Sequence, residues 1–167
     1  MSPLTMAQAL VAEFENECRA TRAMLERVPE ESLGWRPHEK SMTLGRLASH
    51  IAECPGWARR VMSGSELDFA ALDYTPPEAR SRAELLELFE DERRGFTEAL
   101  DGVGDEALLE KWVLRSGDHV ITRSARVAVL RGFVLSHLIH HRGQLTVYLR
   151  LLGVPVPGAY GPTADER

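Results

Sequence analysis

The sequence predicts an all-α protein: a four-helix bundle with a long irregular segment between helices three and four. Three observations predict it. Four stretches carry apolar residues at helical spacing. The connections between them are of mixed length and contain Pro, Gly and Ser. A chain of 167 residues, 44% of them hydrophobic, can bury a core as a single domain over residues 1–167.

The first two helices are predicted at about residues 5–28 and 41–62. Thr5 can cap the first helix and Pro29 ends it. Pro55 lies inside the second, where it should kink the helix or end its first part. The apolar stripe of the first helix consists of Leu10, Phe14, Cys18, Leu25 and Val28.

The third helix is predicted to begin at the capping box of residues 81–84, and the fourth to run from Ser124 to about Leu152. Between them, residues 102–123 are read either as a short hairpin around Ser116-Gly117-Asp118 or as a loop. The tail after Gly153 is rich in Pro and Gly, so we expect an irregular segment lying over the bundle or its mouth.

His137 and His141 lie four residues apart in the segment SHLIHHRGQL, so a helix places them one turn apart on the same face. They share a stripe with Leu130, Val134, Leu145, Tyr148 and Leu152. An unpaired polar group buried there costs roughly 1–3 kcal/mol. A shared metal ion would satisfy both imidazoles. The alternative is a pair of core histidines bonded to carbonyls or carboxylates.

His50 lies on a second apolar face, with Leu47, Cys54 and Trp57. Alone it is more typical of a satisfied core histidine. Two ligands from one helix and one from another would make a three-histidine site with open coordination positions, as in catalytic metal centres. The three histidines together therefore favour a metal site at His50, His137 and His141.

Five neighbouring residues have two readings each. Glu53 could act as a base or accept a hydrogen bond behind the ligands, but a solvated or arginine-paired side chain is the expected state. Cys54 could close the site as a fourth ligand, although a buried core residue is commoner. His140 lies about 100° around the helix from His141 and is expected to point away. Arg142 and Gln144 could orient water or substrate, but are expected to cover a bundle edge.

Composition narrows the function classes. The net charge is −5 and the basic residues are scattered, which argues against a nucleic-acid partner. No apolar run approaches the roughly 20 residues of a membrane span, and the N-terminal sequence does not have the pattern of a signal peptide. The two cysteines argue against a disulfide framework and fit a reducing compartment better. We therefore expect a cytoplasmic protein.

Three segments resemble one family. They are the Trp-x-Pro-His loop at residues 35–38, SMTLGRLASHIAEC, and HLIHHRGQLTVYLRLLGVPVPGAYGPTADE. Together they are similar to the DinB-like (DinB/YfiT) superfamily of metalloenzymes. The resemblance implies a four-helix bundle whose metal is held by one histidine of helix two and an H-x3-H pair of helix four. Those positions fall on His50, His137 and His141. Zinc, nickel, iron and manganese all occur in the family.

The resemblance also implies a class of reaction. Characterised members of the superfamily include bacillithiol S-transferases, mycothiol-dependent maleylpyruvate isomerases and ergothioneine-forming sulfoxide synthases. The expected function is a metal-dependent transferase that activates a low-molecular-weight thiol toward an electrophilic small molecule, with no catalytic residue assigned. The alternatives are a metal-dependent hydrolase and a non-catalytic, metal-stabilised bundle in stress response or partner binding. A homodimer is expected as the commonest assembly.

Overall fold

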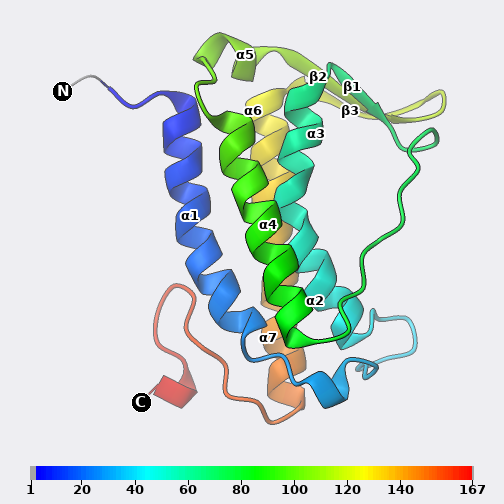
Figure 1. The fold of residues 1–167 in the computed structure, drawn as a ribbon, viewed down its shortest axis with the longest axis vertical. Coiled ribbons are helices and arrows are strands. Elements are labelled where there is room, and N and C mark those ends of the chain that lie inside the picture. Colours follow the sequence, from blue (N-terminus) through cyan, green and yellow to red (C-terminus); the bar gives the residue numbers. More distant parts are fainter. Residues whose placement is uncertain (1–2, 167) are drawn as a thin grey trace.

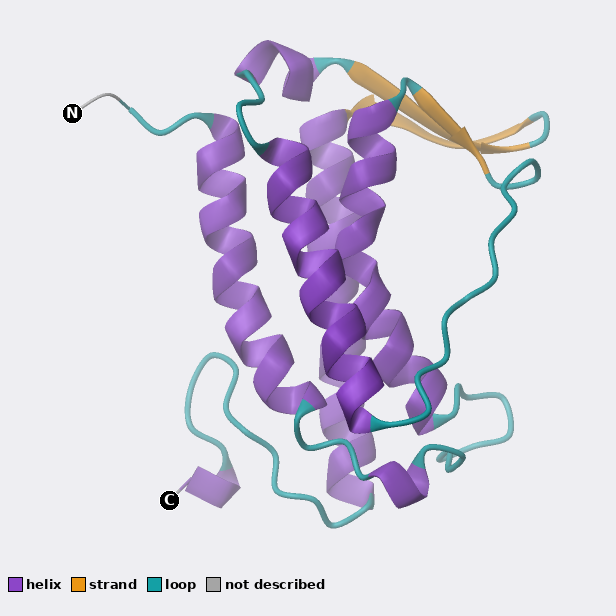
Figure 2. Cartoon of the chain, in the orientation of Figure 1, coloured by secondary structure: helices purple, strands orange, loops and turns teal. Residues whose placement is uncertain are grey.

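The computed structural model describes residues 3–166 and contains a helical bundle capped at one end by a small sheet (Figures 1 and 2). Its α-helices are α1 (Met6–Leu25), α2 (Leu44–Glu53), α3 (Trp57–Ser63), α4 (Arg82–Leu100), α5 (Asp105–Leu109), α6 (Arg126–Val129) and α7 (His137–Leu151). Three short 3-10 turns are η1 (Glu30–Ser32), η2 (Cys54–Gly56) and η4 (Ala164–Glu166). The segment η3 (Leu130–Ser136) is π-helical. The strands are β1 (Glu66–Asp68), β2 (Lys111–Ser116) and β3 (His119–Ala125).

Four long rods form the bundle: α1, α2 continued by α3, α4, and α6 continued through η3 into α7 (Figure 1). The side chains of Thr5, Thr43 and Ser81 cap the first, second and third rods by accepting a backbone N–H three residues ahead. Pro55 interrupts the second rod with the turn η2, as its position predicted. The predicted four-helix bundle is therefore confirmed.

The core lies between the rods and extends under the sheet. Phe14 of α1 stacks on Phe96 of α4 with ring centroids 3.8 Å apart, and both are fully buried. Trp112 of β2 is also fully buried. Apolar burial on this scale is the main favourable term in folding, so the bundle has a core that does not depend on a metal.

Of the two readings of residues 102–123, the hairpin around Ser116-Gly117-Asp118 is the one that the structure contains, so this segment is less irregular than the predicted fold class described. Residues 105–125 form α5 and the antiparallel hairpin of β2 and β3, which turns at Gly117 with φ +57°. Trp112 and Leu114 alternate with more exposed residues along β2, and this period-two pattern buries one face of the strand on the bundle. The sheet gains a third strand because β1 pairs parallel to β2.

Two other segments matter for the site. Residues 69–81 run along the outside of the bundle from the sheet to the opposite end (Figure 1). The tail after α7 folds back toward α1, where the Tyr160 hydroxyl donates to Glu17. The tail thus covers the α1 side of the bundle.

No helix among residues 3–166 combines the length and apolarity needed to cross a membrane. Both cysteines there are buried and unpaired.

Candidate metal centre

Two rods bring three histidines together. His50 lies in the last turn of α2, and His137 and His141 lie in the first turns of α7, directly after the π-helical segment η3. The His137 Nε2 atom is 2.8 Å from His50 Nε2 and 2.9 Å from His141 Nε2. Sequence reasoning put these three residues on two separate helix faces, and the fold makes their ring nitrogens converge on one point.

The convergence leaves one nitrogen with too many neighbours. An imidazole nitrogen has a single in-plane hydrogen-bonding position, as either an N–H donor or a lone-pair acceptor. His137 Nε2 can therefore bond to one of its two neighbours and not to both. An ion that accepted three lone pairs would satisfy all three nitrogens, and ligands at 2.0–2.1 Å in a tetrahedron lie about 3.3 Å apart.

Hydrogen bonds behind the cluster fix the orientation of two rings. His50 Nδ1 lies 2.8 Å from Glu53 Oε1, and His141 Nδ1 lies 2.7 Å from Gln144 Oε1. Because both acceptors are oxygens, each Nδ1 donates and each Nε2 keeps its lone pair toward the cluster. Metal-binding histidines are commonly held in this way. Gln144 is exposed, as expected of a residue at a bundle edge, and its place three residues after His141 also sets it behind that ring.

Glu53 was expected to be solvated or paired with an arginine, and the structure contains the second state, because the residue is only 5% exposed. Its carboxylate does pair with arginine: Arg46 Nη2 donates to Oε1 at 2.8 Å. The Tyr74 hydroxyl donates to Oε2. Burial raises the pKa of Glu53, but the bonds from His50, Tyr74 and Arg46 outweigh it and hold that pKa below its usual value. Glu53 thus stays ionised behind His50.

Cys54 also lies at the cluster. Its Sγ atom and one ligand nitrogen each of His50 and His137 all lie within 4.8 Å of one another, so these three residues could hold a metal ion. Burial, and secondarily the charge of Glu53, raise the pKa of the Cys54 thiol. The two candidate ligand sets share His50 and His137 and differ in whether His141 or Cys54 completes them. His140 is exposed, as its helix position predicted; its ring packs edge-on against that of His141 with centroids 4.9 Å apart, and it is not one of the three residues of the possible metal-binding group.

Arg142 was expected to cover a bundle edge, and its side chain does point away from the histidines. It pairs with Glu17 of α1 at 2.7 Å and donates to the Tyr160 hydroxyl of the tail. Arg142 therefore fastens α7 to α1 and to the tail and has no contact with the candidate centre.

The cluster favours neutral imidazoles. Burial, followed by the charges that His141 and His50 would carry, lowers the pKa of His137 to about 4. Burial likewise lowers the pKa of His141. At pH 7 both rings are therefore neutral and keep the lone pairs that metal binding requires.

We expect the metal-free protein to lose stability as pH falls from 7 to 5. The pKa of His137 is about 4 in the folded state and 6.5 in the reference state, so in this window the unfolded chain binds more protons. Thermal melting in chelator at pH 7, 6 and 5 measures the slope of stability against pH. The slope should be shallower in His137→Asn, and equal slopes in the two proteins would contradict this account.

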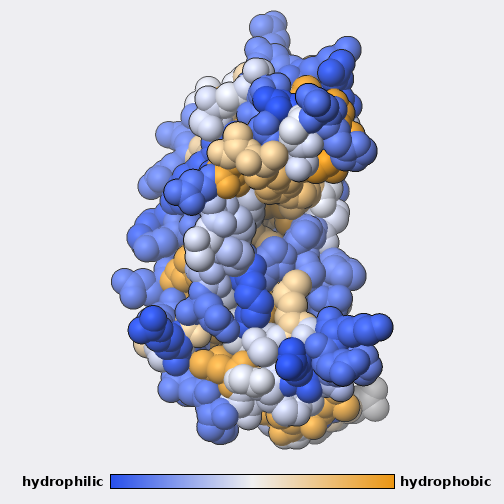
Figure 3. Space-filling model, turned by 90° about the vertical axis from the view of Figure 1, so that its right-hand side faces the viewer, coloured by the Kyte–Doolittle hydropathy of each residue, from blue (hydrophilic) through white to orange (hydrophobic). Residues whose placement is uncertain are grey.

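Aromatic residues form a contiguous group beside His137. Phe133 lies 5.9 Å from the His137 ring and 5.9 Å from Trp57, which also packs on Phe69 and Tyr74. Seen from the side crossed by residues 69–81, the surface is hollowed between the sheet end and the opposite end of the bundle (Figure 3). A groove of about 460 Å³ is lined by Glu53, Trp57 and Tyr74 among others.

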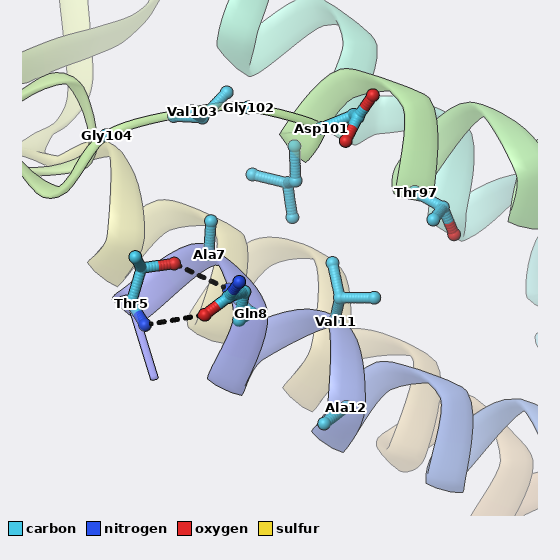
Figure 4. Close-up of a pocket in the computed structure, with 11 residues that line it drawn as sticks. Thr5, Ala7, Gln8, Val11, Ala12, Thr97, Asp101, Gly102, Val103 and Gly104 are labelled. Atoms are coloured by element: carbon cyan, nitrogen blue, oxygen red, sulfur yellow. Dashed lines mark hydrogen bonds between the residues drawn. The ribbon is translucent and has the colours of Figure 1, made fainter. Parts of the chain in front are cut away.

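A second groove, of about 500 Å³, lies between the start of α1 and the end of α4 (Figure 4). Its wall includes the capping box of Thr5 and Gln8, drawn with dashed bonds, and Asp101 is its one ionisable lining residue. None of the histidines lines it. No histidine lines the groove of about 460 Å³ either, but that groove includes Glu53, which bonds to His50.

The fold and the histidine cluster together define the class of protein: a helical bundle with a candidate metal centre between two of its rods. The chain belongs to the DinB family, whose family model matches residues 1–167. The resemblance seen in the sequence is thereby confirmed.

Individual relatives agree with this assignment. The uncharacterized protein YrdA of Bacillus subtilis is 30% identical over 153 residues, which cover 92% of this chain and 87% of that protein. The crystal structure of a DinB-like protein from Bacillus cereus has a TM-score of 0.69 at 26% identity, covering 90% of this chain and 95% of the other. The DinB-like protein YjoA of Bacillus subtilis has a TM-score of 0.70 at 19% identity, covering 95% and 99%, and shows the shared fold alone.

Proposed function

We propose that this protein is a divalent-metal-dependent enzyme that activates a low-molecular-weight thiol toward an electrophilic small molecule. His50, His137 and His141 are the proposed ligands. The observation that carries the proposal is the crowding at His137 Nε2, which has two nitrogen neighbours and one bonding position. Three imidazoles suit zinc, nickel and iron, and manganese is the remaining candidate from the family.

The chain's own residues account for the orientation of this site. Glu53 and Gln144 accept the Nδ1 protons of His50 and His141, so both rings present lone pairs to one point. A divalent ion held by neutral imidazoles lowers the pKa of a coordinated thiol or water and so prepares a nucleophile at neutral pH. The aromatic residues beside His137 restrict water around that point and offer an apolar surface to a substrate.

The test is a reaction panel with untagged protein loaded separately with zinc, nickel, iron or manganese. Small thiols are offered with 1-chloro-2,4-dinitrobenzene, and p-nitrophenyl acetate is offered without thiol. The proposal expects conjugation that needs both metal and thiol. Metal-dependent ester hydrolysis without thiol would instead favour a hydrolase. Light scattering on the same samples tests the predicted homodimer.

A metal-stabilised bundle without catalysis is the second candidate, and the position of Cys54 favours it. A thiolate that completed the coordination would close the site, as in structural zinc centres. Cys54→Ala discriminates between the two. The enzyme proposal expects this variant to keep its metal, whereas loss of metal from Cys54→Ala together with no reaction in the panel would favour the structural role.

Replacing Glu53 by Gln is expected to weaken metal binding about 10- to 100-fold. An amide oxygen accepts the His50 Nδ1 proton less strongly than a carboxylate and leaves Arg46 without its buried partner. Competition with a chromophoric chelator measures the affinity. Glu106→Gln, on the exposed surface of α5, is the matched control and should bind as the parent does. Equal affinities of all three proteins would remove Glu53 from the site.

A further inference from the structure

Arg60 of α3 differs from the neighbouring arginines in what it contacts. It is half-buried, and its guanidinium carbon lies 5.2 Å from the centroid of the Trp57 ring. Within residues 3–166, it forms no ion pair. Arg59, one position earlier, pairs with Glu92 at 2.6 Å and donates to the Asp91 carbonyl. Arg60 is therefore a cation held in place by an aromatic ring.

Arg60 lines the groove of about 460 Å³ beside the histidines. That volume lies in the range of small-molecule sites. Of its acidic lining residues, Glu92 is paired with Arg59, and Glu53 accepts from Arg46, His50 and Tyr74. Asp73 is exposed. Among the described lining residues, the guanidinium of Arg60 is thus left without a carboxylate partner.

The groove adjoins the candidate centre through Glu53. Glu53, which lines it, lies 2.8 Å from His50 Nδ1. Trp57, on which Arg60 rests, packs on Phe133, which in turn packs on His137. A molecule that touches Glu53 in the groove is therefore separated from His50 by that one side chain.

We propose that Arg60 binds the negatively charged group, a carboxylate or a phosphate, of the small molecule on which this protein acts. A guanidinium lying on an aromatic ring is held by a cation–π interaction while its N–H groups stay free to bond in their own plane. Those N–H groups match two oxygens of a carboxylate or phosphate. The identification of this molecule as a substrate rests on the proposed function, whereas the anion contact does not require the metal.

The first experiment tests the anion contact without metal. The metal-free full chain is titrated with succinate or with inorganic phosphate at constant ionic strength, and the indole N–H resonance of Trp57 is followed by NMR. A saturable shift is expected, with affinity about tenfold weaker in Arg60→Gln. Whichever anion binds more tightly in the parent identifies the preferred group. No saturable shift, or equal affinity in Arg60→Gln, would overturn the proposal.

Two control variants sharpen this experiment. Arg27→Gln removes an exposed arginine after α1 and should bind the anion as the parent does. Asp73→Asn removes a negative charge from the groove and should bind it equally or more tightly. Weakening of all variants alike would show a general charge effect and overturn the assignment to Arg60.

The second experiment separates this proposal from the proposed function. Cobalt-loaded protein is titrated with 3-mercaptopropionate and with 2-mercaptoethanol, and binding is followed by the sulfur–cobalt absorption band. The charged thiol should bind about tenfold more tightly, and Arg60→Gln should remove that preference. An unchanged preference in Arg60→Gln overturns the Arg60 proposal and leaves thiol binding intact. If neither thiol binds while the succinate shift still depends on Arg60, the thiol function fails and the anion site stands.

Discussion

Replacing His137 or His141 by Ala is expected to remove most of the bound divalent metal, while replacing His140 by Ala is not. His137 Nε2 is the atom on which the other two rings converge, and His141 supplies one of its two neighbours. Changing a residue behind a ligand costs 10- to 100-fold in affinity, so losing a ligand should cost about 100-fold or more. Metal per chain after dialysis, measured by elemental analysis, gives the answer.

The same variants test whether the metal holds the fold. The core formed by Phe14, Phe96 and Trp112 is fully buried without any contribution from the histidines. Metal-free His141→Ala should therefore still melt cooperatively, unlike a zinc finger. Unfolding of the metal-free chain would support the structural role. Equal metal loss in His140→Ala and His141→Ala would show that the helix-face assignment is wrong.

Replacing Arg142 by Met is expected to destabilise the fold by about 3–5 kcal/mol, the usual cost of removing one partner from a buried ion pair. The Arg142 residue is 2% exposed, and its partner Glu17 would keep a poorly solvated carboxylate without a cation. The Tyr160 hydroxyl would also lose a donor, loosening the tail. Urea unfolding measures the change through the midpoint and slope.

Arg131→Gln is the matched control for this effect. Arg131 forms an exposed ion pair with Glu13, and such pairs contribute about 0–1 kcal/mol. Metal affinity should be unchanged in Arg142→Met, because Arg142 points toward α1 and the tail. Similar losses of stability in the two variants, or a loss of metal in Arg142→Met, would contradict the role assigned to Arg142.

The sequence determined the parts of this protein that depend on neighbours a few residues apart. The caps at Thr5 and Ser81, the break at Pro55 and the apolar stripes predicted the four rods, because each signal acts within one or two helical turns. The spacing of His137 and His141 fixed their common helix face in the same way. The apolar face that His50 shares with Leu47 and Trp57 added His50 to the proposed ligand set, and the family resemblance implied the same three residues. Metal binding itself stays a prediction.

Only the tertiary structure decided which distant residues meet. Tyr74 lies in a loop with no periodic pattern and still donates to Glu53, 21 positions away. Cys54 could be placed on a helix face from the sequence, but its approach to His137 of another rod could not. The parallel pairing of β1 with β2 joins residues 47 positions apart. Such contacts depend on how whole elements pack, and the sequence near each residue carries no signal of the partner that packing brings to it.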